Sequence, residues 1–337
     1  MTRPPSPSRL GELDALRGIA ALIVVAFHYS FKAPEILPSV QTIAWHASWG
    51  HFGVQLFFAI SGFVIFMTLE RTRSAADFAV SRFARLFPAY WTGVVLSTLG
   101  VTLLGAGQLA LDPVHTAINL TMLQGFLYLP SVDGVYWSLT VELAFYVCML
   151  ALWRARLLDR IEWVLLGWIG LHLLWLLVPA LPSRIGLVLA LDYIVWFAVG
   201  MAAYRVRIGA RTWAQQAPVL LAGLAATAYA GKPGEVAVFL GVTALFAALS
   251  RGQLGLLNRP VLLWLGGISY PLYLVHQNLG YALMARLEAL GVSPWLALIA
   301  ALAAALALAD AIHRWIEGPA LDRIRSAWKS RQVLRPA

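Results

Sequence analysis

Apolar stretches about as long as a membrane is thick recur along this chain, and they constrain its fold more than any other feature. A membrane-spanning helix needs about 20 mostly apolar residues. Charged residues make up only 12% of the chain, against about 25% in soluble domains. The sequence therefore predicts an all-α, polytopic membrane helical bundle and excludes a soluble globular protein. We expect about ten spans, at 14–32, 51–70, 88–105, 136–153, 161–180, 185–204, 216–231, 235–250, 260–280 and 294–315.

One further apolar segment, residues 117–129, is too short to cross comfortably. We expect it to be re-entrant or interfacial. The chain then divides into an N-terminal segment, 1–13, a transmembrane domain, 14–317, and a basic tail, 318–337.

The basic residues are unevenly divided between the two sides of this arrangement. Twenty of the 25 lysines and arginines fall on the side that holds both chain ends. By the positive-inside rule, both termini are expected in the cytoplasm, with the protein in the inner (plasma) membrane. The formal net charge of +9 then reflects membrane orientation, and no nucleic-acid partner is expected.

Titratable side chains within apolar spans are costly and are functional candidates by default. We interpret His172 as structural, and Asp192 and Asp310 as packing or helix-end groups. The candidates in this chain are Asp14, Arg17, His28, Glu142, His172, Asp192, His276 and Asp310.

Three of these candidates fall in the outer half of the membrane when helical rise is counted from the span ends. His28 and Glu142 each lie about 9 Å below the outer surface, and His276 lies in the same half. A carboxylate beside an imidazole is the pair that a general base needs. We therefore expect His28 to act as the base and Glu142 to orient it. The alternatives are a histidine bonded to a carbonyl, a structural salt bridge of Glu142, and a helix-bridging His276.

Two arginines precede the third predicted span. Arg82 and Arg85 are three residues apart, so they share a helix face and suit an anionic phosphate ligand. Ordinary positive-inside charge explains them equally simply. A bend at Pro271 in the ninth span, beside Gly266 and Gly267, predicts either a cavity wall or a packing kink. No metal site is expected, because no group of histidines, cysteines and carboxylates has metal-ligand spacing.

Taken together, six segments in order resemble the acyltransferase-3 family of bacterial membrane acyltransferases. They read LDALRGIAALIVVAFH, FGVQLFFAISGFVI, SRFARLFPAYW, VYWSLTVELAFY, GGISYPLYLVH and IEGPA, and they cover residues 13 to about 320. The resemblance implies transfer of an acyl group, usually acetyl, from cytoplasmic acyl-CoA to a hydroxyl of an extracytoplasmic glycan.

The resemblance also implies roles for particular residues of this chain. The essential Arg and His of the first helix fall on Arg17 and His28, and the remaining motifs include Glu142. The donor would be held by Arg17, Arg82, Arg85, Ser269 and Tyr270. The acceptor would meet Trp137, Ser138, Gln55 and His276. Gln55 departs from the family, which often carries an acidic residue there, so a second carboxylate helper is missing.

Two other classes of function remain open from the sequence. Buried Arg, His and Glu also build proton relays, so a flippase or transporter of a lipid-linked sugar or acyl carrier is the main alternative. The other is a structural membrane anchor for a polysaccharide complex. The acceptor, the acyl chain, an acyl-His28 intermediate, partner proteins and the oligomeric state are all left open.

Overall fold

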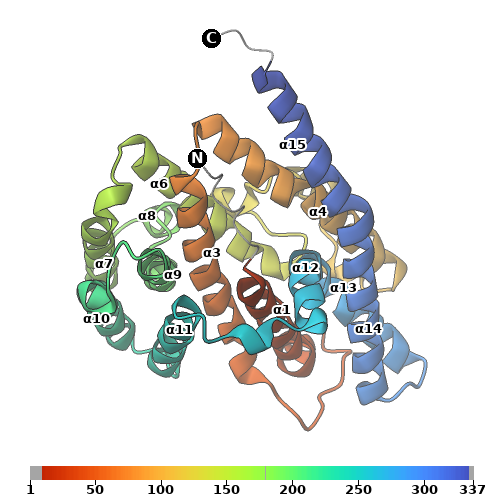
Figure 1. The fold of residues 1–337 in the computed structure, drawn as a ribbon. Helices are drawn as coiled ribbons and strands as arrows, with labels where there is room; N and C mark the ends of the chain where they lie inside the picture. Colours follow the sequence, from red (N-terminus) through yellow and green to blue (C-terminus); the bar gives the residue numbers. More distant parts are fainter. Residues whose placement is uncertain (1–9, 179, 334–337) are drawn as a thin grey trace.

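The computed structural model of the chain describes residues 10–178 and 180–333, and it is helical throughout its regular elements (Figure 1). The N-terminal segment predicted at 1–13 lies mostly outside these residues, and so do Arg3, Arg9 and Arg335. The α-helices are α1 Gly11–Phe27, α2 Ala33–Ile36, α3 Gly53–Glu70, α4 Ala75–Leu103, α5 Pro113–Asn119, α6 Trp137–Arg154, α7 Ile161–Leu177, α8 Ser183–Val188, α9 Ile194–Arg207, α10 Trp213–Ala230, α11 Glu235–Ser250, α12 Pro260–Val275, α13 Gln277–Ala289, α14 Pro294–Ile312 and α15 Gly318–Val333.

Helices occupy all ten predicted segments, but not all are long enough to cross a membrane. Six helical stretches of the described chain are long and apolar enough to cross a membrane. The helices α11 and α12 are apolar but shorter than this. A count of ten spans is therefore not confirmed. The six stretches are Gly11–Ile36, Ser48–Glu70, Ala75–Leu103, Gly134–Arg154, Leu158–Leu177 and Pro294–Arg331.

Two of the predicted spans are broken. The span expected at 185–204 is divided into α8 and α9 by Ala190, which adopts the left-handed conformation with a φ of 49°. The span expected at 260–280 ends at His276, and α13 begins at the next residue. The backbone is non-helical only at the first break, beside other helices of the protein, where irregular structure is tolerated. His276 keeps helical dihedral angles, with a φ of −78° and a ψ of −38°.

The first helix packs closely against α12, and glycine makes the close approach achievable. A Cβ atom on Gly18 would lie 2.7 Å from the backbone nitrogen of Gly266. A Cβ on Gly266 would lie 2.0 Å from the carbonyl oxygen of Asp14. Small residues let helix backbones approach in this way. The contact aligns α1 and α12 along their length and brings their distal ends, at His28 and His276, together.

Residues 117–129 do not form a membrane-crossing helix. They comprise the end of α5, a turn and a short 3₁₀ segment, Gln124–Leu127. Asn119 fixes this segment, because its side-chain amide donates to the carbonyls of His115 and Pro130 and its oxygen accepts from the Val132 N–H. The segment thus contains no helix long enough to span a membrane, as predicted, and its re-entrant or interfacial placement stays a prediction.

The helix α14 continues into α15 through a π-helical turn, His313–Glu317. The 38 residues from Pro294 to Arg331 would extend about 57 Å at a rise of 1.5 Å per residue. That is nearly twice the thickness of the hydrocarbon core, about 30 Å. A helix of this length is longer than the apolar layer is thick, and its C-terminal part, α15, runs beside α4 (Figure 1).

Candidate active site

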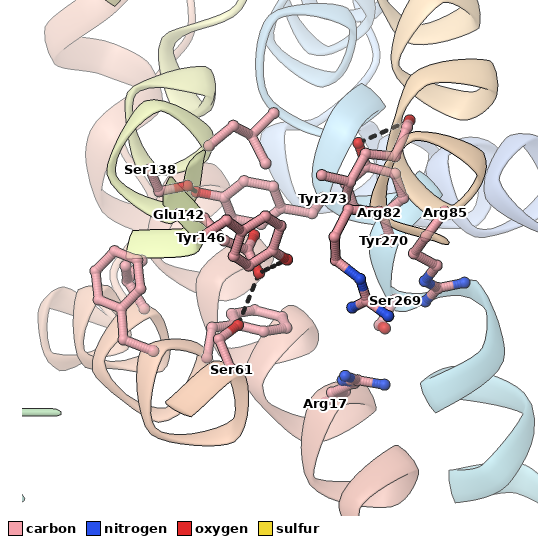
Figure 2. A pocket seen from close by; sticks show the side chains of 15 residues that line it. Arg17, Ser61, Arg82, Arg85, Ser138, Glu142, Tyr146, Ser269, Tyr270 and Tyr273 are labelled. Carbon is pink, nitrogen blue, oxygen red and sulfur yellow. Dashed lines mark hydrogen bonds between the residues drawn. The ribbon is translucent and has the colours of Figure 1, made fainter. Parts of the chain in front are cut away.

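A cavity of about 100 Å³ lies between α1, α3, α4, α6 and α12 (Figure 2). We name it the arginine cavity, because Arg17, Arg82 and Arg85 point toward one another in it. Its other polar lining residues are Ser61, Ser138, Glu142, Tyr146, Ser269, Tyr270 and Tyr273. The structure thus brings together all five residues expected at the donor site.

The three arginines differ in how their charges are balanced. Arg85 forms an ion pair with Glu317, a carboxylate only 1% exposed, whose other oxygen lies 2.7 Å from Nδ1 of His313. Arg17 pairs with Asp14 at 3.4 Å. Arg82 donates to the Ser81 hydroxyl at 3.3 Å, and its buried Nε lacks a hydrogen-bond partner among the described residues. Arg82 is therefore the arginine best placed to accept a new anionic partner.

Glu142 belongs to the arginine cavity. Its Oε1 accepts hydrogen bonds from the Ser61 hydroxyl at 2.8 Å and the Tyr146 hydroxyl at 2.5 Å (Figure 2). The sequence predicts that the Glu142 carboxylate pairs with His28, whereas in the structure His28 lies 3.0 Å from His276. The depth estimate fails because it measures height along a helix and says nothing about which neighbour a side chain faces.

Ser269 and Tyr270 line the cavity, but their hydroxyl protons are already used. Ser269 donates to the carbonyl of Gly266 at 2.8 Å, and Tyr270 donates to the carbonyl of Leu86 at 3.0 Å. The Tyr270 ring also lies 5.8 Å from the Arg85 guanidinium carbon, within the range of a cation–π contact. In this arrangement both residues form the cavity wall, and Tyr270 also contacts Arg85.

A second cavity, of about 500 Å³, lies at the other end of α1. We name it the histidine cavity, because His28 and His51 line it. The Trp137 and Tyr193 rings lie side by side in its wall, 5.4 Å apart, and Lys232 and Glu235 are also lining residues. A surface that combines aromatic faces with polar groups suits a hydroxylated ligand.

The hydrogen bonds of His28 define its tautomer. Nδ1 of His276 lies 2.9 Å from the Tyr273 carbonyl, and a carbonyl only accepts, so Nδ1 carries the proton and Nε2 has a lone pair. Nδ1 of His28 lies 2.9 Å from the Val24 carbonyl and 3.0 Å from Nε2 of His276, and both of these atoms can only accept. His28 therefore carries its proton on Nδ1 as well, and its Nε2 is the basic nitrogen. His28 also begins a π-helical turn, His28–Lys32, a distortion frequent at functional sites.

Gln55 lines the histidine cavity and is nearly buried. With its amide nitrogen directed toward the backbone, it donates to the carbonyls of His51 at 3.1 Å and Phe52 at 3.2 Å. A carboxylate at this position would face two acceptors. The Gln55 amide thus satisfies the carbonyl pair at the start of α3.

Two residues line both cavities: Val54 and Tyr273. The Tyr273 hydroxyl donates to the carbonyl of Val135 at 3.0 Å and lies 2.6 Å from the hydroxyl of Ser138. These bonds connect α12 to the start of α6. Tyr273 therefore separates the two cavities, and a molecule reaching from one to the other must pass it.

The remaining candidates lie apart from both cavities. Asp310 accepts from the indole of Trp264 and from Arg314, both at 2.7 Å, and His172 is buried in α7. Among the described residues, no group of three or more His, Cys, Asp or Glu side chains is arranged to hold a metal ion.

Sequence reasoning missed Tyr273 and Glu317 and assigned His276 to the acceptor. The signal for Tyr273 was present in the run SYPLYLVH, where it follows Tyr270 by three residues. Glu317 is the acidic residue of the IEGPA segment, to which the sequence assigned no role.

Comparison with known proteins completes this description. A family model described as an acyltransferase domain matches residues 10–314, nearly the whole chain. The chain belongs to the acyltransferase-3 family. The family resemblance drawn from the sequence is thereby confirmed, and both cavities lie within the matched region.

Relatives with curated names match over shorter stretches. Acyltransferase MdmB of Streptomyces mycarofaciens is 31% identical over 49% of this chain and 44% of its own length. Nodulation protein 10 of Rhizobium leguminosarum is 33% identical over 30% of this chain and 34% of its own. Peptidoglycan O-acetyltransferase OatA of Listeria monocytogenes is 28% identical over 45% of this chain and 25% of its own length. The chain thus spans less than half the length of each of these three relatives. No solved structure matches the chain.

Proposed function

We propose that this protein is a membrane O-acyltransferase that moves an acyl group, preferentially acetyl, from acyl-CoA to a hydroxyl of a glycan-like acceptor. Family membership supports acyl transfer, and the name of OatA supports acetyl and a cell-envelope glycan. The observation that carries the proposal is the pair of cavities at the two ends of α1, one cationic and one with a basic histidine nitrogen.

The donor binds at the arginine cavity. The CoA diphosphate carries negative charge that Arg82, Arg85 and Arg17 neutralise, and guanidinium groups bind phosphate in two-point fashion. Arg82 contributes most, because Arg85 and Arg17 already have carboxylate partners. The acyl-pantetheine arm then extends along α12 past Tyr273 toward His28.

The acceptor binds in the histidine cavity, where Trp137 and Gln55 are placed for contact with it. Ser138, which the sequence assigns to the acceptor, instead lines the arginine cavity and lies against the Tyr273 hydroxyl. Nε2 of His28 takes the proton of the acceptor hydroxyl while that oxygen attacks the thioester carbonyl. The new C–O bond forms, the C–S bond breaks, and the departing CoA thiolate takes the proton back from the imidazolium. The products are an ester and CoA.

His276 positions His28 in this scheme. Its Nε2 accepts the hydrogen bond from His28 Nδ1, which holds the proton there and keeps the reactive lone pair on Nε2. Glu142 acts on the donor side, where it balances the arginines and holds Ser61 and Tyr146.

The charge distribution supports a topology for the proposed enzyme. We propose that the ends of the chain and the arginine cavity face the cytoplasm of the inner membrane, where acyl-CoA is made, and that the histidine cavity faces the opposite side. Labelling single cysteines introduced at Arg331 and at Lys232 in intact cells tests this. A membrane-impermeant maleimide should reach the second position and not the first.

The experiment that tests the activity uses the purified protein in detergent with [¹⁴C]acetyl-CoA and a cell-envelope glycan extract as acceptor. We expect thiol release together with alkali-labile label on the extract. His28→Ala should lower the rate by at least about 100-fold, the scale of general-base catalysis. His115→Ala, at an exposed histidine outside both cavities, is the matched control and should be unchanged.

Other outcomes separate the alternatives. A transporter would release no thiol in detergent, where no gradient exists. Label bound to the protein through His28 would indicate an acyl-enzyme. A His28→Ala variant with normal turnover would contradict the proposal.

A further inference from the structure

A large hollow lies outside the two cavities, where α15 meets the end of α3 and the start of α4. It has a volume of about 940 Å³, within the range of about 300–1,000 Å³ that small-molecule sites occupy. We name it the α15 hollow. Its polar and aromatic lining residues are Thr68, Arg71, Thr72, Arg73, Asp77, Ser81, Arg82, Arg325, Trp328 and Lys329.

The α15 hollow is strongly cationic, with five basic residues against one carboxylate. None of the five forms an ion pair within 4.0 Å with a carboxylate of the described chain. Arg82 and Arg325 both donate to the hydroxyl of Ser81, at 3.3 and 3.5 Å, so their guanidinium groups are neighbours. Neighbouring like charges repel, and an anion bound between them relieves that repulsion.

One face of α15 supplies three of the residues that line the hollow. Arg325, Trp328 and Lys329 are three and four residues apart, so they lie side by side on the helix. The indole nitrogen of Trp328 donates to Oδ1 of Asp77 at 2.7 Å, which holds the ring against α4. Arg323 and Arg331 lie on other faces and do not line the hollow. The family model ends at residue 314, so this face lies beyond the matched domain.

The hollow leads toward the donor site. Arg82 and Arg325 also line a smaller hollow of about 220 Å³, together with Arg17, Arg85 and His313. Arg17, Arg82 and Arg85 in turn line the arginine cavity. The guanidinium groups thus form a continuous row from α15 to the point where we place the CoA diphosphate.

We propose that the α15 hollow binds the adenosine 3′-phosphate end of the CoA donor, an inference that rests on the proposed function. Arg325 and Lys329 bind the 3′-phosphate, and the Trp328 ring lies against the adenine. Aromatic side chains stack on the flat face of a nucleobase such as adenine, and this stacking adds affinity. The C-terminal helix is then part of the donor site.

The test compares CoA with 3′-dephospho-CoA by titration calorimetry on the purified full chain in an uncharged detergent at low salt. The wild type should bind CoA about tenfold more tightly, because the 3′-phosphate adds charge-assisted hydrogen bonds. In Arg325→Ala and Lys329→Ala, the Kd for CoA should rise about tenfold while that for 3′-dephospho-CoA changes less than about threefold. Arg323→Ala and Arg331→Ala are the matched controls and should keep the wild-type preference.

The remaining outcomes decide between this inference and its rivals. Equal binding of CoA and 3′-dephospho-CoA by the wild type, with acyl transfer intact, overturns the α15 site alone. Absence of any CoA binding and thiol release overturns the proposed function as well. Arg325→Ala that lowers binding to phosphatidylglycerol vesicles but keeps the CoA preference would assign the hollow to a lipid headgroup, against the proposal. Trp328→Ala should weaken binding of both nucleotides, whereas Trp328→Phe should retain most affinity.

Discussion

The arginine cavity and the histidine cavity are built in different ways, although α1 contributes to both. The arginine cavity consists of charges held by dedicated partners, such as Arg85 on Glu317 and Arg17 on Asp14. The histidine cavity depends on neutral hydrogen bonds to backbone carbonyls and on aromatic walls. Charged groups recognise a charged ligand, whereas a histidine that must take up a proton works best when it is neutral at rest.

The difference predicts that changes in the two cavities affect different kinetic constants. Changes at His28 or His276 should lower kcat, since they alter the base. Changes at Arg82 or Arg85 should act on the binding of CoA. The substitutions below are ordered by the size of the expected effect.

His276→Phe should have the largest effect among these substitutions. Phenylalanine fills the space but removes the Nε2 acceptor of His276, so that only the Val24 carbonyl still accepts from His28 Nδ1. We expect kcat to fall about 100-fold with the KM for acetyl-CoA within about twofold. His276→Gln should recover part of the loss, because an amide oxygen also accepts a hydrogen bond. Steady-state kinetics in detergent checks this, and a change confined to KM would remove His276 from the positioning role.

Arg82→Lys should raise the Kd for CoA about tenfold, because lysine cannot bind phosphate with two parallel hydrogen bonds. Arg85→Lys should act more weakly, since Arg85 is already committed to Glu317 and stacked on Tyr270. Calorimetry on the two variants measures the difference. The opposite ranking would show that the Arg85–Glu317 pair opens when the donor binds.

Glu142→Gln tests whether this residue serves the arginine cavity or the base. The glutamine oxygen still accepts from Ser61 and Tyr146, so kcat should fall less than about tenfold and its pH profile should keep its shape. A loss as large as that of His276→Phe would instead connect Glu142 to His28, as the sequence alone indicates.

Gln55→Glu should have the smallest effect and should act on stability. The new carboxylate would face the carbonyls of His51 and Phe52 in place of an amide donor, a loss of about 1–3 kcal/mol. The midpoint of thermal unfolding should fall by about 1–4 °C, with no gain in turnover. Raised turnover at an unchanged midpoint would mean that a second carboxylate assists the acceptor.

The sequence predicts the parts of the site that lie within one helix. Arg17 and His28 are eleven positions apart, which separates them by about 16 Å along the helix axis. Arg82 and Arg85 are three positions apart, so they share one face of α4. Contacts between distant helices were not predicted. The His28–His276 pair depends on the close packing of α1 on α12 at Gly18 and Gly266, which no local pattern specifies.

The broken helices also show that a local sequence pattern does not specify every feature of the fold. The span predicted at 185–204 contains no proline at its break, and Ala190 adopts its left-handed conformation without a local signal. The six-segment family pattern, by contrast, was readable because its motifs are local and ordered. Local sequence thus predicts which residues matter, whereas helix packing determines which of them meet.

The central claim is that a donor bound by the arginines presents its acyl group to His28 past Tyr273. The most direct test is photo-cross-linking of the purified protein with a CoA thioester whose acyl group carries a diazirine, followed by mass spectrometry. We predict adducts on Tyr273, Val54 or His28, which excess CoA abolishes. Adducts that resist excess CoA, or that fall on lipid-facing residues instead, would contradict the account.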